Sequence, residues 1–444
     1  MRFNTTRGQA PAVSFTDALF EGLAPDGGLY VPETIEPWTA DELARLPRRT
    51  LTEIGLRALR PFTRGEIDPA TLEAVVVEAL NFDIPLVELE PGIFVLELFH
   101  GPTFAFKDVG ARVMARLMAS LHRGSDPLVV LAATSGDTGS AVANAFHRVP
   151  NTRVVILYPE GRVSPTQEAQ LTMFNGERAN VRAFAVAGSF DDCHRLTREA
   201  FGDAALRRRM RLTSANSVNV GRLLPQSVYY FHAIAQARRR DPSTSLRAGA
   251  SDDAPVVFST PSGNFGNLTA GLFAKRAGLP IERFVAATNA NDVVPEYLET
   301  GTFKPRASVA TLANAMDVGH PSNFERMLWL YGGDLEAMRR DIAGCCFTDD
   351  DVRATIRCVY EERGYLLDPH SAIAYMGLKG QVGRVGPVGI FLATAHPAKF
   401  SEIVEPIIGR EVEKPAPLAQ ALARPRHIIR IEPSLAAVMG TLDG

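Results

Sequence analysis

The sequence predicts an α/β protein built on parallel sheets, and three observations support this prediction. Short apolar runs recur along the chain, for example at 128–133, 256–259 and 388–393. Each run leads into a polar loop rich in glycine, serine, threonine or asparagine, and a helical pattern follows the loop. Strands that are apolar on both sides belong to parallel sheets covered by helices on both faces. Ligands of such sheets bind at the carboxyl ends of the strands, where these polar loops lie.

Length and composition are those of an ordinary globular protein. The chain has 444 residues, of which 46% are hydrophobic and 22% charged, and 47 basic against 50 acidic side chains give a formal net charge of −3. At ~100–200 residues per domain, this length predicts about two to four domains. The near-neutral charge disfavours binding to nucleic acid or to a membrane surface, whereas a small anionic substrate requires only local positive charge.

The sequence favours a cytoplasmic protein. Its first residues, MRFNTTRGQAPAV, contain no apolar core of a signal peptide, and no apolar run reaches the ~18 residues of a membrane helix. The four cysteines form no C-x-x-C pair. We therefore expect a reducing compartment and no membrane partner.

Residues 1–85 are expected to form a mainly helical domain. Apolar residues recur there at spacings of three and four, and prolines, Pro61 among them, separate the helical stretches 41–46, 51–59 and 70–80. The alternation of strands and helices begins near residue 86, so the remaining 86–444 are expected to form the core.

A polar stretch at 237–254, ARRRDPSTSLRAGASDDA, interrupts the alternation. Its composition is typical of a surface insertion. An aspartate directly follows the three arginines 238–240, which favours a solvated helix end over a basic binding patch.

The segment 100–108, HGPTFAFKD, has the clearest chemical character. Lys107 stands between Phe106 and Asp108, just after the apolar run 93–99. Desolvation among aromatic side chains lowers the pKa of a lysine and leaves a neutral, nucleophilic amine suited to Schiff-base chemistry. A lysine that only caps a helix or pairs with Asp108 explains the segment equally well.

Two further loops have the composition of anion-binding loops. PSGNFGN at 261–267 lies between a strand and a helix, and its small residues allow backbone N–H groups to converge on a phosphate. It has neither the Walker A nor the G-x-G-x-x-G spacing. TSGDTG at 134–139 follows another strand and could hold a carboxylate or a second phosphate. An ordinary N-cap turn is the alternative for each loop.

Two more segments offer polar groups at strand ends. SANSVNVGR at 214–222 combines amide and hydroxyl donors with one arginine, which suits phosphate recognition, although a polar loop that closes onto a helix has the same composition. Thr394 places a hydroxyl at the end of the run 388–393, and the lone His396 is expected to be structural. A Schiff-base lysine, a phosphate cup and a partner for a ring nitrogen are what pyridoxal 5′-phosphate requires, so we expect this cofactor.

In this order along the chain, the motifs resemble those of the threonine synthase family, pyridoxal-phosphate enzymes of fold type II. The resemblance covers nearly the whole chain and extends to GLAPDGGLYVP at 22–32, AMDVG at 315–319 and ATAHPAKF at 393–400. It implies a tryptophan synthase β-like α/β fold with two parallel-sheet lobes and the N-terminal helical domain. The implied small lobe covers roughly 108–225, and the large lobe covers 86–107 and 226–444.

The resemblance also implies a role for individual residues. Lys107 matches the catalytic lysine that holds the cofactor, and Thr394 matches the hydroxyl that faces the pyridine nitrogen. The loop that cups the cofactor phosphate is matched by Gly263, Asn264, Phe265 and Asn267. The loop that binds the substrate carboxylate is matched by Thr134, Ser135, Gly136, Asp137 and Thr138. The substrate phosphate would be held by Asn216, Ser217 and Arg222, and no metal ligand is implied.

The implied reaction converts O-phospho-L-homoserine and water to L-threonine and phosphate by γ-elimination and β-addition of water. An alternative is a phospho-lyase that acts on this or a similar phosphorylated amino acid and releases a 2-oxo acid and ammonia, because both reactions begin with the same eliminations. A binding protein without catalysis would lack Lys107 or the glycine loop, and both are present. We expect a small-molecule substrate as partner, no nucleic acid, and a monomer or homodimer.

Overall fold

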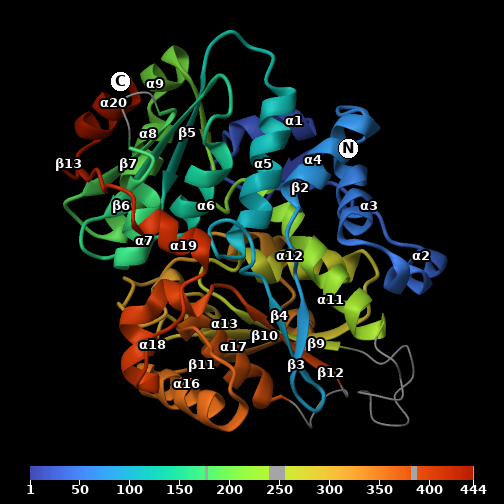
Figure 1. Ribbon diagram of the computed structural model, residues 1–444. Helices are drawn as coiled ribbons and strands as arrows, with labels where there is room; N and C mark the ends of the chain where they lie inside the picture. The colour runs from blue at the N-terminus through green and yellow to red at the C-terminus, as the bar shows by residue number, and fades with distance from the viewer. Residues whose placement is uncertain (176–178, 240–255, 382–387, 444) are drawn as a thin grey trace.

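Two large sheets form the framework of the computed structural model, which describes residues 1–175, 179–239, 256–381 and 388–443. One sheet has six strands in the order β11-β10-β9-β12-β4-β3, and the other has five in the order β13-β7-β6-β5-β8. Figure 1 shows the five-stranded sheet above the six-stranded sheet, with helices α2, α3 and α4 at the right. The predicted insertion at 237–254 lies outside the described residues except for 237–239, which end a helix.

The six-stranded sheet is parallel except for the hairpin between β3 and β4, which pair antiparallel. Neighbouring residues of its strands belong to different apolar clusters: Phe258, Phe284 and Ile390 to one, and Val257, Val285 and Phe391 to another. Both faces are therefore covered, as the apolar runs predict. Its strands are β3 (Leu86–Glu90), β4 (Ile93–Glu97), β9 (Val256–Pro261), β10 (Ile281–Thr288), β11 (Ile342–Cys346) and β12 (Val388–Ala393).

The five-stranded sheet is parallel throughout. Its strands are β5 (Leu128–Ala133), β6 (Thr152–Pro159), β7 (Val181–Val186), β8 (Arg211–Ser214) and β13 (Ile429–Ile431). Here the structure corrects one expectation: the last strand, β13, pairs with β7, so it does not belong to the larger lobe. Pairing between such distant segments leaves no local pattern in the sequence, since a short edge strand can join either sheet.

The N-terminal domain is mainly helical, as expected. It contains α1 (Phe15–Glu21), α2 (Ala40–Ala44), α3 (Leu51–Thr63), α4 (Pro69–Ala79) and a ribbon of β1 (Phe3–Thr5) and β2 (Tyr30–Pro32). Pro61 does not end the second stretch, because α3 continues through it to Thr63. A proline this close to a helix end removes one backbone hydrogen bond, and reciprocal capping between Thr50 and Glu53 secures the other end.

Helices cover the two sheets and lie between them. None in the described part of the chain is both long and apolar enough to cross a membrane. They are α5 (Lys107–Leu121), α6 (Asp137–Phe146), α7 (Pro165–Thr172), α8 (Phe190–Gly202), α9 (Ala204–Arg209), α10 (Val220–Leu223), α11 (Ser227–Arg239), α12 (Gly266–Arg276), α13 (Val293–Thr300), α14 (Phe324–Leu330), α15 (Leu335–Asp341), α16 (Asp349–Arg363), α17 (Pro369–Lys379), α18 (Ser401–Ile408), α19 (Ala416–Leu422) and α20 (Leu435–Asp443), with 3₁₀ turns η1 (Leu46–Arg48), η2 (Leu224–Gln226), η3 (Asn314–Met316) and η4 (Pro397–Phe400).

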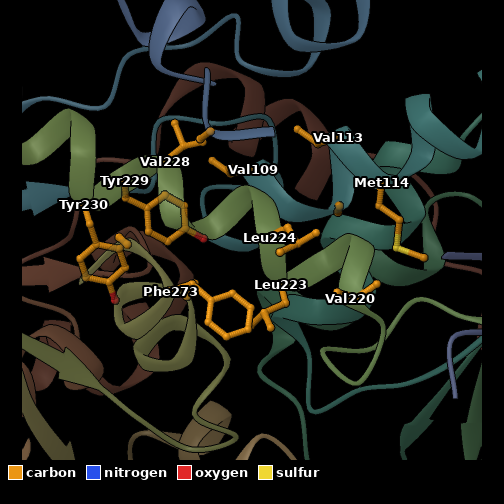
Figure 2. Packing of buried hydrophobic residues seen from close by; sticks show 14 of the residues in the cluster. Val109, Val113, Met114, Val220, Leu223, Leu224, Val228, Tyr229, Tyr230 and Phe273 are labelled. Atoms are coloured by element: carbon orange, nitrogen blue, oxygen red, sulfur yellow. The ribbon is translucent and has the colours of Figure 1, made fainter. Parts of the chain in front are cut away.

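A buried apolar cluster fixes α5 in place (Figure 2). Val109 and Met114 of α5 belong to the same fully buried cluster as Leu223 of α10, Val228 of α11 and Phe273 of α12. Full burial of one such side chain contributes ~1.5–3 kcal/mol. The first residue of α5, Lys107, is therefore attached to a rigid element.

Candidate active site

The candidate site lies where strands of both sheets end and α5 begins. Two backbone hydrogen bonds hold the segment before α5 against the segment after β12: Phe106 N–H donates to the Thr394 carbonyl at 2.9 Å, and His396 N–H donates to the Phe104 carbonyl at 3.0 Å. Because β12 and β9 are parallel neighbours, the loop 261–267 begins at the same edge. The structure thus brings Lys107, Thr394 and the glycine loop together at one edge.

Burial makes the neutral form of the Lys107 amine more accessible than in a free lysine. Burial lowers its pKa to about 8, and the positive charges of Lys399 and Arg222 act in the same direction, while Asp137 opposes them. Its Nζ lies 5.5 Å from the centre of the Phe106 ring. The neighbouring Asp108 carboxylate is engaged elsewhere, since it accepts hydrogen bonds from the backbone and hydroxyl of Thr103 at 2.9 and 2.7 Å.

The loop 263–267 forms a cup of backbone N–H groups. Within the described chain, the N–H groups of residues 263–266 donate to no acceptor, and they lie at the start of α12. Gly263 is required, because a Cβ atom there would lie 2.6 Å from the Cα of Met316. Phe265 adopts a left-handed conformation, with φ of 59°. Asn267 shapes the turn, since its amide donates to the Pro261 carbonyl at 2.9 Å. Open N–H groups at a helix start suit a phosphate.

The segment 315–319 lies against the loop 263–267, where Met316 approaches Gly263. The Ala315 N–H donates to Nε2 of the buried His370, whose Nδ1 lies 2.6 Å from Asp368. Asp317 accepts hydrogen bonds from the backbone and hydroxyl of Thr311, and burial raises its pKa to about 7. The sequence does not predict a role for His370 and Asp368, because nothing near them in the chain indicates a link to the glycine loop.

The loop 134–138 is a second cup. The Thr134 hydroxyl accepts hydrogen bonds from the N–H groups of Gly136 and Gly139 at 2.9 and 2.8 Å. In the described residues, the N–H groups of Ser135, Asp137 and Thr138 donate to no acceptor. The Gly136 backbone has φ of 128°, and a Cβ atom there would collide with Gln167. Three open donors at the start of α6 suit a carboxylate.

Arg222 is a buried cation with unused donors. Its side chain is 3% exposed, and burial lowers its pKa to about 10. Its Nη1 donates to the Ala215 carbonyl at 2.8 Å, whereas its Nε donates to no acceptor in the part of the chain described. A buried unsatisfied donor is costly, so this arrangement is typical of a site for an anion.

The neighbours of Arg222 differ in what they contact. The side chain of Asn216 bonds both the N–H and the carbonyl of Ala133, at 3.1 and 2.6 Å, and so fastens its loop to the end of β5. The sequence does not predict this contact of Asn216. The Ser217 hydroxyl accepts a hydrogen bond from the Asn264 amide at 2.6 Å. Ser217 thus stands between the two lobes.

Two buried cations, Lys399 and Arg326, complete the site, and neither was expected there from the sequence. Lys399 pairs with Asp137 at 2.7 Å. Arg326 is fully buried and donates to the backbone carbonyls of Ser217, Val218 and Tyr30 at 3.0, 2.6 and 3.1 Å. Lys399 belongs to the segment 393–400, one of those that carry the family resemblance, so the sequence could have indicated its role. No sequence pattern indicates a role for Arg326.

The Thr394 hydroxyl makes no hydrogen bond within the described residues, and its side chain is buried at the mouth of the site. His396 has the structural place that was expected. Its Nδ1 accepts a hydrogen bond from the Ala398 N–H at 3.1 Å, and burial lowers its pKa to about 4. It is therefore a neutral capping residue at neutral pH.

Comparison with known proteins places this geometry among described families. Residues 77–393 match the family model described as pyridoxal-phosphate dependent enzyme, residues 2–80 match threonine synthase N terminus, and residues 371–441 match threonine synthase, C-terminal. Threonine synthase from Haemophilus influenzae is 46% identical over 410 residues, which are 91% of each chain.

Solved structures agree with these matches. The crystal structure of threonine synthase from Escherichia coli aligns with a TM-score of 0.91 at 39% identity, over 100% of this chain and 99% of that one. The structure of PLP-bound threonine synthase from Brucella melitensis aligns with a TM-score of 0.90 at 38% identity, over 100% of this chain and 98% of that one.

Proposed function

The chain belongs to the threonine synthase family of pyridoxal-phosphate-dependent enzymes, and from this premise we propose that its site converts O-phospho-L-homoserine and water to L-threonine and phosphate. One observation carries the proposal: the Lys107 amine, with a pKa lowered to about 8, lies at the edge where two loops with open N–H groups and a buried arginine meet.

The residues present fit the cofactor. Lys107 would bind it covalently through Nζ, and the N–H groups of residues 263–266 would hold its phosphate. The Thr394 hydroxyl would face the ring nitrogen. A hydroxyl is a neutral partner, so it does not enforce protonation of that nitrogen as a carboxylate would.

Pyridoxal phosphate, when bound, supplies an electron sink beside the substrate amine. Lys107 would be the base that accepts the proton from Cα, because burial lowers the pKa of its amine to about 8 and so favours the neutral form. Because α5 is fixed by its apolar packing, this amine stays positioned beside the substrate.

The two ends of the substrate would be held by different loops. The open N–H groups of Ser135, Asp137 and Thr138 would bind the carboxylate. Arg222, with its unused Nε, and the Ser217 hydroxyl would bind the phosphate and stabilise it as it leaves Cγ. The Asn216 amide already bonds Ala133, so we assign it the positioning of this loop.

We also propose a division into residues 1–85 and 86–444, which the matched ranges 2–80 and 77–393 support. Within the core, β13 belongs with the smaller sheet. A monomer or homodimer and a cytoplasmic location remain predictions, and analytical ultracentrifugation would decide the first.

The direct test begins with the absorbance of the purified protein in the cofactor band. Lys107→Ala should abolish this band. With O-phosphohomoserine, the enzyme should release phosphate and threonine in equal amounts. Release of 2-oxobutyrate as the main product would favour the phospho-lyase, and the absence of a band after incubation with pyridoxal phosphate would refute both readings.

A further inference from the structure

Asp137 and Lys399 form a buried ion pair between the two lobes. Asp137 begins α6 of the smaller lobe, and Lys399 lies in η4 of the larger lobe. Their charged atoms lie 2.7 Å apart, and the side chains are 4% and 0% exposed. Although burial alone would raise it, the positive charges of Lys399 and Lys107 hold the pKa of the Asp137 carboxyl below its usual range. The aspartate is therefore ionised.

An ionised aspartate is an unexpected member of a loop that binds anions. The open N–H groups of Ser135 and Thr138 lie directly beside Asp137 in the chain. A carboxylate bound there would stand close to the Asp137 carboxylate in a region of low effective dielectric. Like charges in such a place repel strongly unless a counter-ion neutralises one of them.

The contacts of Lys399 make it suitable as this counter-ion. Its Nζ also donates to the Thr103 carbonyl at 2.9 Å, which fixes its position, and Thr103 in turn is held by Asp108. Asp137 receives a further hydrogen bond from Gln167 at 3.1 Å. The aspartate is thus turned toward Lys399 and Gln167, and the loop N–H groups stay open.

We propose that Lys399 is a positioning residue that neutralises Asp137 and thereby allows the 135–138 loop to accept the carboxylate of an amino-acid substrate. The proposal rests on the function proposed above, because it deepens the assignment of that loop. It predicts that the loop tolerates either a charged pair or two neutral side chains at 137 and 399, but not an unpaired aspartate.

The test compares two ligands on the holoenzyme. L-2-aminobutyrate carries a carboxylate, and (S)-2-amino-1-butanol has the same amine and carbon chain with a hydroxymethyl group in its place. Both dissociation constants are measured from the absorbance change of the bound cofactor. Lys399→Met should weaken binding of L-2-aminobutyrate at least tenfold and that of the alcohol less than threefold.

The double variant Asp137→Asn/Lys399→Met should restore binding of L-2-aminobutyrate to within about threefold of the wild type. It removes both buried charges together, so it remains informative if Lys399→Met alone does not fold. Lys275→Met is a matched control, because Lys275 pairs with Asp341 at the same 2.7 Å but lies on the far end of α12. It should change neither dissociation constant.

An equal loss for both ligands in Lys399→Met, or a double variant that has lost its preference for the carboxylate ligand, would overturn the proposal. Either result would show that Lys399 only links the two lobes and does not act on the carboxylate site. The ligands carry no phosphate, so these outcomes do not depend on the reaction. If the proposed function is wrong, the product assay with O-phosphohomoserine fails while the ligand comparison still gives its own answer.

Discussion

The side-chain amide of Asn264 donates a hydrogen bond to the hydroxyl oxygen of Ser217 at 2.6 Å. Asn264 belongs to the glycine loop of the larger lobe, and Ser217 belongs to the loop after β8 in the smaller lobe. The side-chain Oδ1 of Asn264 also accepts a hydrogen bond from the N–H of Ser322. One asparagine therefore links the cup proposed for the cofactor phosphate to the loop proposed for the substrate phosphate.

This link predicts different effects of two substitutions. Ser217→Ala removes one hydrogen bond next to the substrate phosphate, worth ~0.5–1.5 kcal/mol, and should raise KM for O-phosphohomoserine by about 2- to 10-fold. Asn264→Ala removes both bonds and should also weaken the affinity for pyridoxal phosphate. Steady-state kinetics and cofactor titration check these effects. A Ser217→Ala enzyme whose cofactor affinity falls as far as that of Asn264→Ala would contradict the division of roles.

The close approach of Gly263 to Met316 gives a second prediction. A Cβ atom at 263 would lie 2.6 Å from a backbone atom that cannot move alone, so Gly263→Ala must shift the cup. Overpacking of this kind costs ~1–3 kcal/mol, and pyridoxal phosphate should bind about 5- to 100-fold more weakly. Gly202→Ala is the control, since a Cβ atom there meets nothing within 4 Å. Unchanged cofactor affinity in Gly263→Ala would show that the cup does not hold the phosphate.

The lowered pKa of Lys107 predicts how cofactor uptake depends on pH. Only the neutral amine attacks an aldehyde, so the rate at which the cofactor-free protein takes up pyridoxal phosphate should rise with pH and level off above about 8. An unperturbed lysine would still gain rate near its ordinary pKa of 10.5. Asp137 raises the pKa of Lys107, so Asp137→Asn should move the midpoint to lower pH. Stopped-flow absorbance measures the rate, and a rise that continues to pH 10 would refute the assignment.

The sequence predicts those parts of the site that depend on local order. The loops 134–138 and 261–267 stand between a strand and a helix, so their neighbours in the chain place them at strand ends. Lys399 and Asp137, by contrast, meet only because the two lobes face each other. Such contacts between distant segments depend on how the two lobes pack together. The spacing of residues in the sequence does not predict that packing. The edge strand β13 escaped prediction for the same reason.

Arg326 carries the last prediction, because it is fully buried and joins three parts of the chain. Its guanidinium donates to the carbonyls of Ser217 and Val218 in the smaller lobe and of Tyr30 in the N-terminal domain. Burial lowers its pKa to about 9, so at neutral pH it is a charged group that these carbonyls must stabilise.

Arg326→Met fills similar space but leaves the three carbonyls without their donor, at a cost of ~1–3 kcal/mol for each buried group that stays unsatisfied. Thermal unfolding should therefore occur at a lower temperature. KM for O-phosphohomoserine should rise as well, because the loop that carries Ser217 loses its support. Arg60→Met on the exposed side of α3 is the control for loss of an arginine. If Arg326→Met lowers stability but leaves KM unchanged, Arg326 joins the domains without shaping the substrate loop.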